Sequence, residues 1–125
     1  VAAAAGLPES RAHMRGSLSR DDRAAVFAGA SALIATSSLA AWPWRVVEAM
    51  TLGVPVIAVE SGVHRDVIAD GGLLVSEEEI ADAVVDAAGR DGATASRLGV
   101  LAADRSRAFS WASSAERVWS LHADL

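Results

Sequence analysis

The sequence predicts an α/β fold in which a parallel sheet carries helices on both of its faces. Short apolar runs rich in β-branched residues alternate along the 125 residues with longer segments of helical spacing. Such alternation favours parallel strands joined by helical crossovers. The chain has no Cys and 52% of its residues are hydrophobic, so a buried core rather than disulfide bonds must stabilise it. We expect one domain, or a piece of a larger one, with about four strands.

The N-terminal segment contains helix-forming, turn-forming and extended stretches. Val1–Ala5 is rich in Ala and favours a helix, which Gly6–Pro8 ends. Arg11–Arg15 is interpreted as a short strand. Because the chain begins at what looks like the end of a helix, and without Met, we expect it to be truncated.

A helix and a strand are predicted before the central part of the chain. Either Ser19 or Asp21 is expected to cap the helix, whose acidic first turn suits the positive end of the helix dipole, and the helix is expected to continue over Ala24–Gly29. The apolar run Ala32–Ala35 then favours a short buried strand. The loop at the carboxyl end of that strand begins with Thr36–Ser38.

The central segment predicts a helix followed by a buried strand. Pro43 suits the first turn of a helix, where its missing N–H is no loss, and the helix is expected over Trp44–Leu52. Gly53 stands where a left-handed C-cap is needed, and Pro55 follows it to stop the helix. The apolar, β-branched run Val54–Val59 predicts the strand.

The remainder of the chain is predicted to be mostly helical. His64–Ile68 is expected to form one helical turn, and Leu73–Val75 a short strand after a Gly-rich turn. Ser76 and Glu79 have the spacing of a capping box at the start of the next helix. Two further helices are expected, over Ala93–Ala108 and after Ser110. The last helix has Ala115, Val118, Trp119 and His122 on its apolar face, and Phe109, Trp111 and Trp119 are interpreted as packing residues.

Charge and composition exclude several classes of function. The net charge of −5 and the pI near 5.0 argue against non-specific binding of nucleic acid. His13, His64 and His122 do not have metal-ligand spacing, so we expect no metal and no cofactor. No run is long enough to span a membrane. We expect a cytoplasmic location, with peripheral attachment to the inner face of the membrane left open.

Three segments together resemble one enzyme family. They are E-A-M-T-L-G-V-P-V-I-A at Glu48–Ala58, S-G-V-H-R-D-V-I-A-D-G-G-L-L-V at Ser61–Val75, and F-S-W at Phe109–Trp111. Their order and spacing resemble the donor-binding segment of the retaining GT-B glycosyltransferases of group 1. The likeness extends from about Arg15 onward.

The resemblance implies the fold and the reaction. The chain would be the Rossmann-like C-terminal half of a GT-B fold, with residues 1–125 as a single partial domain that binds a nucleotide-diphospho-sugar. The family transfers the sugar with retention to an acceptor hydroxyl, without a metal. The acceptor, a glycan, lipid or small molecule, would bind an N-terminal domain that this chain lacks. We therefore expect the chain alone to be inactive.

The resemblance also implies which residues bind the donor's ribose and phosphates. Glu48 would accept hydrogen bonds from the two ribose hydroxyls, since two carboxylate oxygens match a diol. The helix start at Pro43 would aim free N–H groups at the phosphates, and Arg45 would add charge. The alternatives are that Glu48 and Arg45 are ordinary solvated helix residues.

Four further residues are candidates for the donor site. Trp42 and Trp44 either line the sugar or base pocket, cover a domain seam, or belong to the core. Ser61 and Gly62 stand on the next loop, where Gly permits a ligand to approach the backbone closely. The neighbouring His64 could face the same cleft, but a structural role is favoured, because a lone His more often has that role.

The sequence departs from the family pattern at the donor loop. Ala40 stands where the family has a first Glu that is thought to face the donor sugar, and Ala41–Pro43 replaces its Gly-Phe-Gly. The chain has no Lys, although the family binds diphosphate with an Arg and a Lys. These departures keep open a non-catalytic Rossmann-like domain that has lost the donor site. A phospho-receiver domain is disfavoured, because that class needs a Lys.

Overall fold

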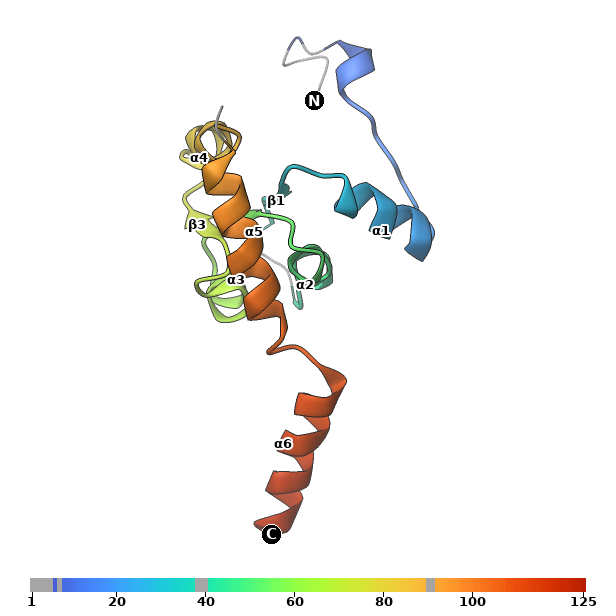
Figure 1. Cartoon of the computed structure of the whole chain (residues 1–125), viewed down its shortest axis with the longest axis vertical. Coiled ribbons are helices and arrows are strands. Elements are labelled where there is room, and N and C mark those ends of the chain that lie inside the picture. Colours follow the sequence, from blue (N-terminus) through green and yellow to red (C-terminus); the bar gives the residue numbers. More distant parts are fainter. Residues whose placement is uncertain (1–5, 7, 38–40, 90–91) are drawn as a thin grey trace.

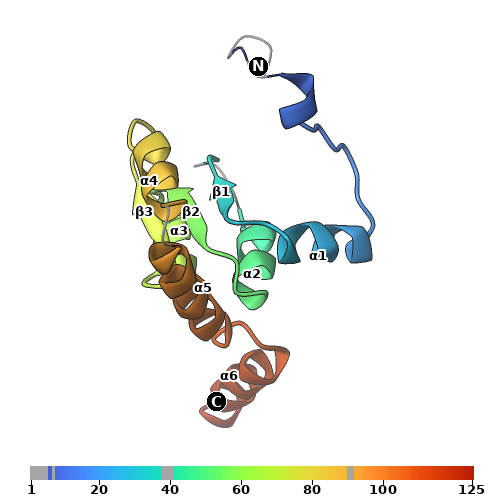
Figure 2. The ribbon, with the colours of Figure 1, turned by 45° about the horizontal axis from the view of Figure 1, so that its top comes forward.

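The computed structural model describes residue 6 and residues 8–37, 41–89 and 92–125. Its centre is a sheet of three parallel strands in the order β1-β2-β3, of which Figure 1 shows the position in the chain and Figure 2 the order. The strands are β1 (Leu33–Ala35), β2 (Val56–Val59) and β3 (Leu73–Val75). The apolar run before Glu60 therefore forms the central strand, which is buried along its whole length.

Helices cover both faces of the sheet, as the sequence predicts (Figure 2). Side chains alternate between the faces of a strand, so neighbouring residues of β2 enter different clusters. Val56 and Ala58 pack with α2 (Trp44–Thr51) and α3 (Gly62–Ile68). Ile57 packs against α4 (Ile80–Ala87) and α5 (Ala93–Ser106). The α/β fold with a parallel sheet is thereby confirmed.

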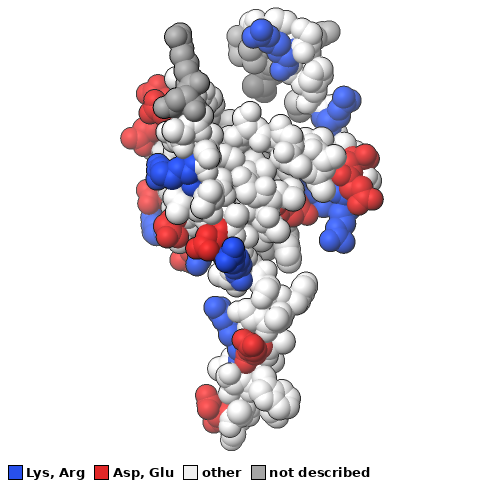
Figure 3. All heavy atoms as spheres, in the orientation of Figure 1, with Lys and Arg blue, Asp and Glu red and all other residues white. Residues whose placement is uncertain are grey.

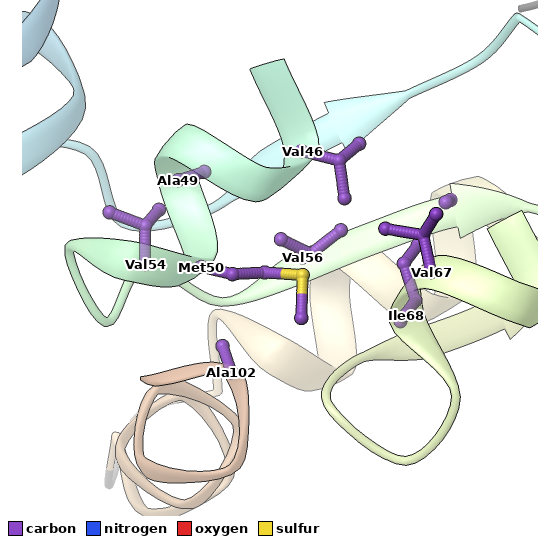
Figure 4. Close-up of a cluster of buried hydrophobic side chains, with 9 residues drawn as sticks. Val46, Ala49, Met50, Val54, Val56, Val67, Ile68 and Ala102 are labelled. Carbon is purple, nitrogen blue, oxygen red and sulfur yellow. The ribbon is translucent and has the colours of Figure 1, made fainter. Parts of the chain in front are cut away.

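Helix α2 is fixed at both ends by the residues that the sequence singles out. Pro43 precedes its first residue, and Gly53 beyond its end has a φ of +68°, the left-handed conformation that glycine permits. Between these ends Met50 is fully buried. Figure 4 shows its side chain among Val56, Ile68 and Ala102, so α2, α3, α5 and β2 share one core.

The N-terminal part contains a short 3₁₀ helix η1 (Glu9–Arg11) and the helix α1 (Arg20–Ala28). Ser19 caps α1 by accepting a hydrogen bond from the N–H of Asp22 at 3.1 Å. The strand predicted over residues 11–15 is wrong, and the described sheet has three strands rather than four. Polar residues dominate this segment, and its Met14 is 93% exposed, so it offers no apolar face to bury. The helix predicted over residues 1–5 lies outside the described residues.

The predicted capping box forms only in part. The carboxylate of Glu79 accepts a hydrogen bond from the N–H of Ser76 at 3.0 Å, as the box requires. However, α4 begins only at Ile80, after Glu79, and the three preceding residues form a turn. The reciprocal hydroxyl contact is replaced by a backbone bond from Glu79 to the carbonyl of Ser76 at 3.2 Å.

The last helix, α6 (Trp111–Ala123), extends away from the sheet (Figure 1). Ser110 caps it as predicted, accepting from the N–H of Ser113 at 3.0 Å. Its predicted apolar face is exposed, however, with Val118 at 67%. The side chains of Trp111 and Trp119 are likewise 87% and 73% exposed. The interpretation of these two residues as packing residues is wrong within this chain, because α6 projects beyond the core. Phe109, just before α6, is half-buried as expected.

The exposed face of α6 and the edge strands lead us to expect self-association. Apolar patches and sheet edges favour association when nothing covers them. We expect the weight-average mass of this chain in sedimentation velocity to rise with concentration. A clean monomer at high concentration would contradict this expectation.

No helix in the described part of the chain is both long and apolar enough to cross a membrane. Figure 3 shows charged groups of both signs at the rim of an extensive uncharged surface, with many of them gathered over α1.

Candidate functional site

Ligands of parallel α/β sheets bind at the loops that follow the carboxyl ends of the strands. In this chain those loops follow β1 and β2. The first loop leads through Trp42 and Pro43 into α2, which has no side-chain N-cap. The N–H of Trp44 donates to Trp42, and the amides of Val46 and Val47 donate to Pro43. Among the described residues, the N–H of Arg45 has no backbone partner. The start of α2 thus retains a free donor for an anion.

Glu48 lies one turn inside α2 and is bound by a residue of α1. Nε and Nη2 of Arg23 donate to the two oxygens of Glu48 at 2.9 and 2.8 Å, which is a bidentate pair. The side chain of Glu48 remains 38% exposed and that of Arg23 20% exposed. The carboxylate is therefore both fixed by the protein and accessible from solvent.

The surroundings of Glu48 favour its ionised form. The hydrogen bonds from Arg23 hold the pKa of Glu48 below its ordinary value. Partial burial opposes this shift, whereas the positive charges of Arg23, Arg45 and Arg20 lower the pKa further. The positive charges of three arginines from α1 and α2 thus act on one carboxylate, which stays charged at neutral pH.

Trp42 and Trp44 lie at a different place, beside the junction of α5 and α6. Trp42 packs edge-on against both Trp44 and Phe109, with ring centroids 6.1 and 5.6 Å apart. The guanidinium of Arg105 lies 5.1 Å from the ring of Phe109. Together with Trp111 these side chains line a groove of about 590 Å³. Trp42 and Trp44 are 42% and 63% exposed, so they are surface aromatics rather than core residues.

The residues after β2 are occupied by contacts within the protein. Ser61 caps α3, because its hydroxyl accepts from the N–H of His64 at 3.1 Å. The ring of His64 is buried and donates from Nδ1 to the carbonyl of Val59 at 2.7 Å. His64 is thus a structural residue, as predicted. Gly62 is exposed at the first position of α3, which leaves its backbone open to solvent.

The candidate residues are therefore divided among three places. Arg45 and Glu48 lie together on α2 beside α1, Trp42 and Trp44 line the aromatic groove, and Ser61 with Gly62 begins α3. Ala40 lies outside the described residues. Sequence reasoning missed Arg23, because no local pattern connects it with a carboxylate 25 residues later. Within the described ranges, no group of three His, Cys, Asp or Glu side chains gathers as a metal site would require.

Comparison with known proteins gives one match. A family model described as glycosyl transferases group 1 matches residues 2–90, which is more than half of the chain. No curated protein and no solved structure matches the chain.

Proposed function

Because this chain belongs to the glycosyl transferases group 1 family, we propose that it is the nucleotide-diphospho-sugar binding part of a retaining, cytoplasmic hexosyltransferase. The sugar is transferred from the donor to a hydroxyl of a glycan, lipid or small molecule, with no metal or further cofactor. The observation that carries this proposal is the state of Glu48. Its carboxylate is ionised, fixed in place and 38% exposed.

A fixed carboxylate of this kind suits the vicinal hydroxyls of a ribose. A carboxylate accepts about four hydrogen bonds, and Arg23 uses one position on each oxygen. Each oxygen retains a second position, so two neighbouring hydroxyls can each donate one hydrogen bond. Glu48 thereby binds the donor through a group that does not react.

The start of α2 is proposed to bind the diphosphate. The helix dipole, the free N–H of Arg45 and its guanidinium all favour negative charge there. They stabilise the additional charge that develops on the diphosphate as the sugar leaves. Trp42 and Trp44 would line the sugar or base pocket, and Ser61 with Gly62 would bring backbone close to the ligand.

A second candidate is a domain that has kept the fold and lost the donor site. Pro43 is buried at the start of α2 and has no N–H to donate. Trp42 packs on Phe109 rather than leaving an open glycine-lined loop. Ser61 already uses its hydroxyl as a helix cap. These contacts favour a binding or interaction role without catalysis.

Nucleotide binding by the intact protein distinguishes the two candidates. We expect calorimetric titration with UDP, GDP and ADP to detect binding of at least one of them, because the proposed site recognises ribose and diphosphate. The corresponding monophosphate should bind at least about tenfold more weakly, since it lacks one charged phosphate. Absence of binding by all three diphosphates would support the non-catalytic domain.

A further inference from the structure

Arg23 makes an ion pair unlike the others in the described part of the chain. Its guanidinium joins α1 to α2 across 25 positions of sequence, with both carboxylate oxygens engaged. The pairs Arg65–Glu60 and Arg107–Asp104 are local, and each of their side chains is more than half exposed. An exposed local pair contributes little to stability. The partly buried, bidentate geometry of Arg23 therefore has to be explained separately.

The geometry assigns Arg23 as a positioning residue for Glu48, and we propose that it holds the carboxylate in the orientation that receives the ribose diol. This role rests on the proposed function of Glu48. The planar guanidinium matches both oxygens at 2.8 and 2.9 Å, so it fixes the plane of the carboxylate as well as its position. The side chain of Glu48 remains 38% exposed, so the carboxylate held in this way is still accessible to a ligand.

A free glutamate side chain loses much rotational freedom when a ligand binds it. Ordering a side chain rich in rotamers opposes binding, because that freedom is lost when the ligand binds. In this protein Arg23 has already ordered Glu48 before any ligand arrives. The two helices that carry the pair are in contact, and α2 is packed into the core through Val46, Ala49 and Met50. The carboxylate is thus preorganised by tertiary structure.

Hydrogen bonding distinguishes Arg23 from the two other arginines whose charges act on Glu48. Arg20 on α1 and Arg45 on α2 also lower the pKa of Glu48, but only through their charge. Neither makes a hydrogen bond to it among the described residues. Arg20 therefore provides a matched control, since it has the same charge and lies on the same helix but makes no contact that sets the carboxylate's orientation.

The test measures how well the intact protein distinguishes ribose from deoxyribose. The probe is whichever of UDP, GDP and ADP binds most tightly, together with its 2′-deoxy counterpart. We expect Arg23→Met to reduce the preference for the ribose form by about three- to tenfold, within the range of coupling between residues in contact. Arg23→Lys should restore part of the preference, because it keeps the charge and loses the bidentate geometry. Arg20→Met should leave the preference unchanged.

Thermal unfolding of each variant separates a positioning role from a purely structural one. A structural role would lower the unfolding temperature of Arg23→Met and leave its ribose preference as in the wild type, and this result would overturn the proposal. An increased affinity in Arg23→Met would also overturn it, because Arg23 would then compete with the ligand.

Glu48→Gln, titrated in parallel, distinguishes this proposal from the proposed function. If Glu48→Gln loses the ribose preference and Arg23→Met keeps it, the proposed function stands and the role of Arg23 is wrong. If Glu48→Gln keeps the preference, or if no nucleotide binds the wild type, the proposed function fails and the role of Arg23 fails with it.

Discussion

Glu48→Gln is expected to weaken nucleotide-sugar binding by the intact protein by about ten- to a hundredfold, because a hydrogen bond to a charged group contributes roughly 1.5–3 kcal/mol. The substitution keeps the size of the side chain, removes its charge and turns one acceptor oxygen into a donor. It also removes one of the two acceptors of Arg23, so the amide is no longer held by a symmetric pair of bonds. Isothermal titration with the diphosphate nucleotide measures the effect.

The loss should be specific to the ribose. A 2′-deoxy donor should bind the wild type more weakly, but Glu48→Gln should weaken its binding by a smaller factor, because both changes remove the same interaction. Glu116→Gln, a substitution of the same kind on the exposed helix α6, should leave affinity unchanged. Strictly additive losses, or unchanged affinity in Glu48→Gln, would show that Glu48 is a solvated helix residue.

The lowered pKa of Glu48 predicts how the difference in nucleotide affinity between the wild type and Glu48→Gln depends on pH. Because the pKa in the folded protein is below its ordinary value, the carboxylate stays charged in mildly acidic solution. The advantage of the wild type over Glu48→Gln should therefore persist below the pH at which an ordinary glutamate is protonated, and disappear as the pH falls through the lowered value. The ratio of the two affinities is the quantity to follow, since protonation of the ligand's phosphates affects both proteins.

Gly99→Ala is expected to destabilise the fold by about 1–3 kcal/mol, because it overpacks the contact between α2 and α5. A Cβ at Gly99 would lie 2.5 Å from the carbonyl oxygen of Gly53. That oxygen belongs to backbone and cannot rotate away as a side chain would. Gly53 is itself fixed in the left-handed conformation that ends α2. The two helices would have to separate, and α2 carries Glu48.

Urea denaturation measures this effect through the midpoint of unfolding. Gly16→Ala is the matched control, since a Cβ there meets nothing within 4 Å and its φ is not positive. We expect Gly16→Ala to be neutral or slightly stabilising, because Ala restricts the unfolded chain. Equal midpoints for Gly99→Ala and the wild type would mean that α2 and α5 are not in close contact.

Local signals in the sequence were sufficient to predict most elements of the fold. The apolar run before Glu60 predicts the central strand, Gly53 predicts the end of α2, and Ser110 predicts the cap of α6. Each signal acts through hydrogen bonds or burial within a few residues, so it can be recognised without knowledge of the rest of the chain. The prediction of a strand at residues 11–15 is wrong because that segment lacks such a local signal. A short polar stretch has no local preference strong enough to identify it.

The sequence alone was enough to predict a carboxylate inside the helix after the first loop, at Glu48, with Arg45 beside it. The packed fold was needed to show that Arg23 binds both oxygens of that carboxylate, and that Trp42 packs against both Trp44 and Phe109. It also decided that the apolar face of α6 stays exposed. Such contacts depend on the angle and distance at which helices pack, which follow from core side chains distributed over the whole chain. The direction in which a helical side chain points is encoded locally, but the partner that it meets is not.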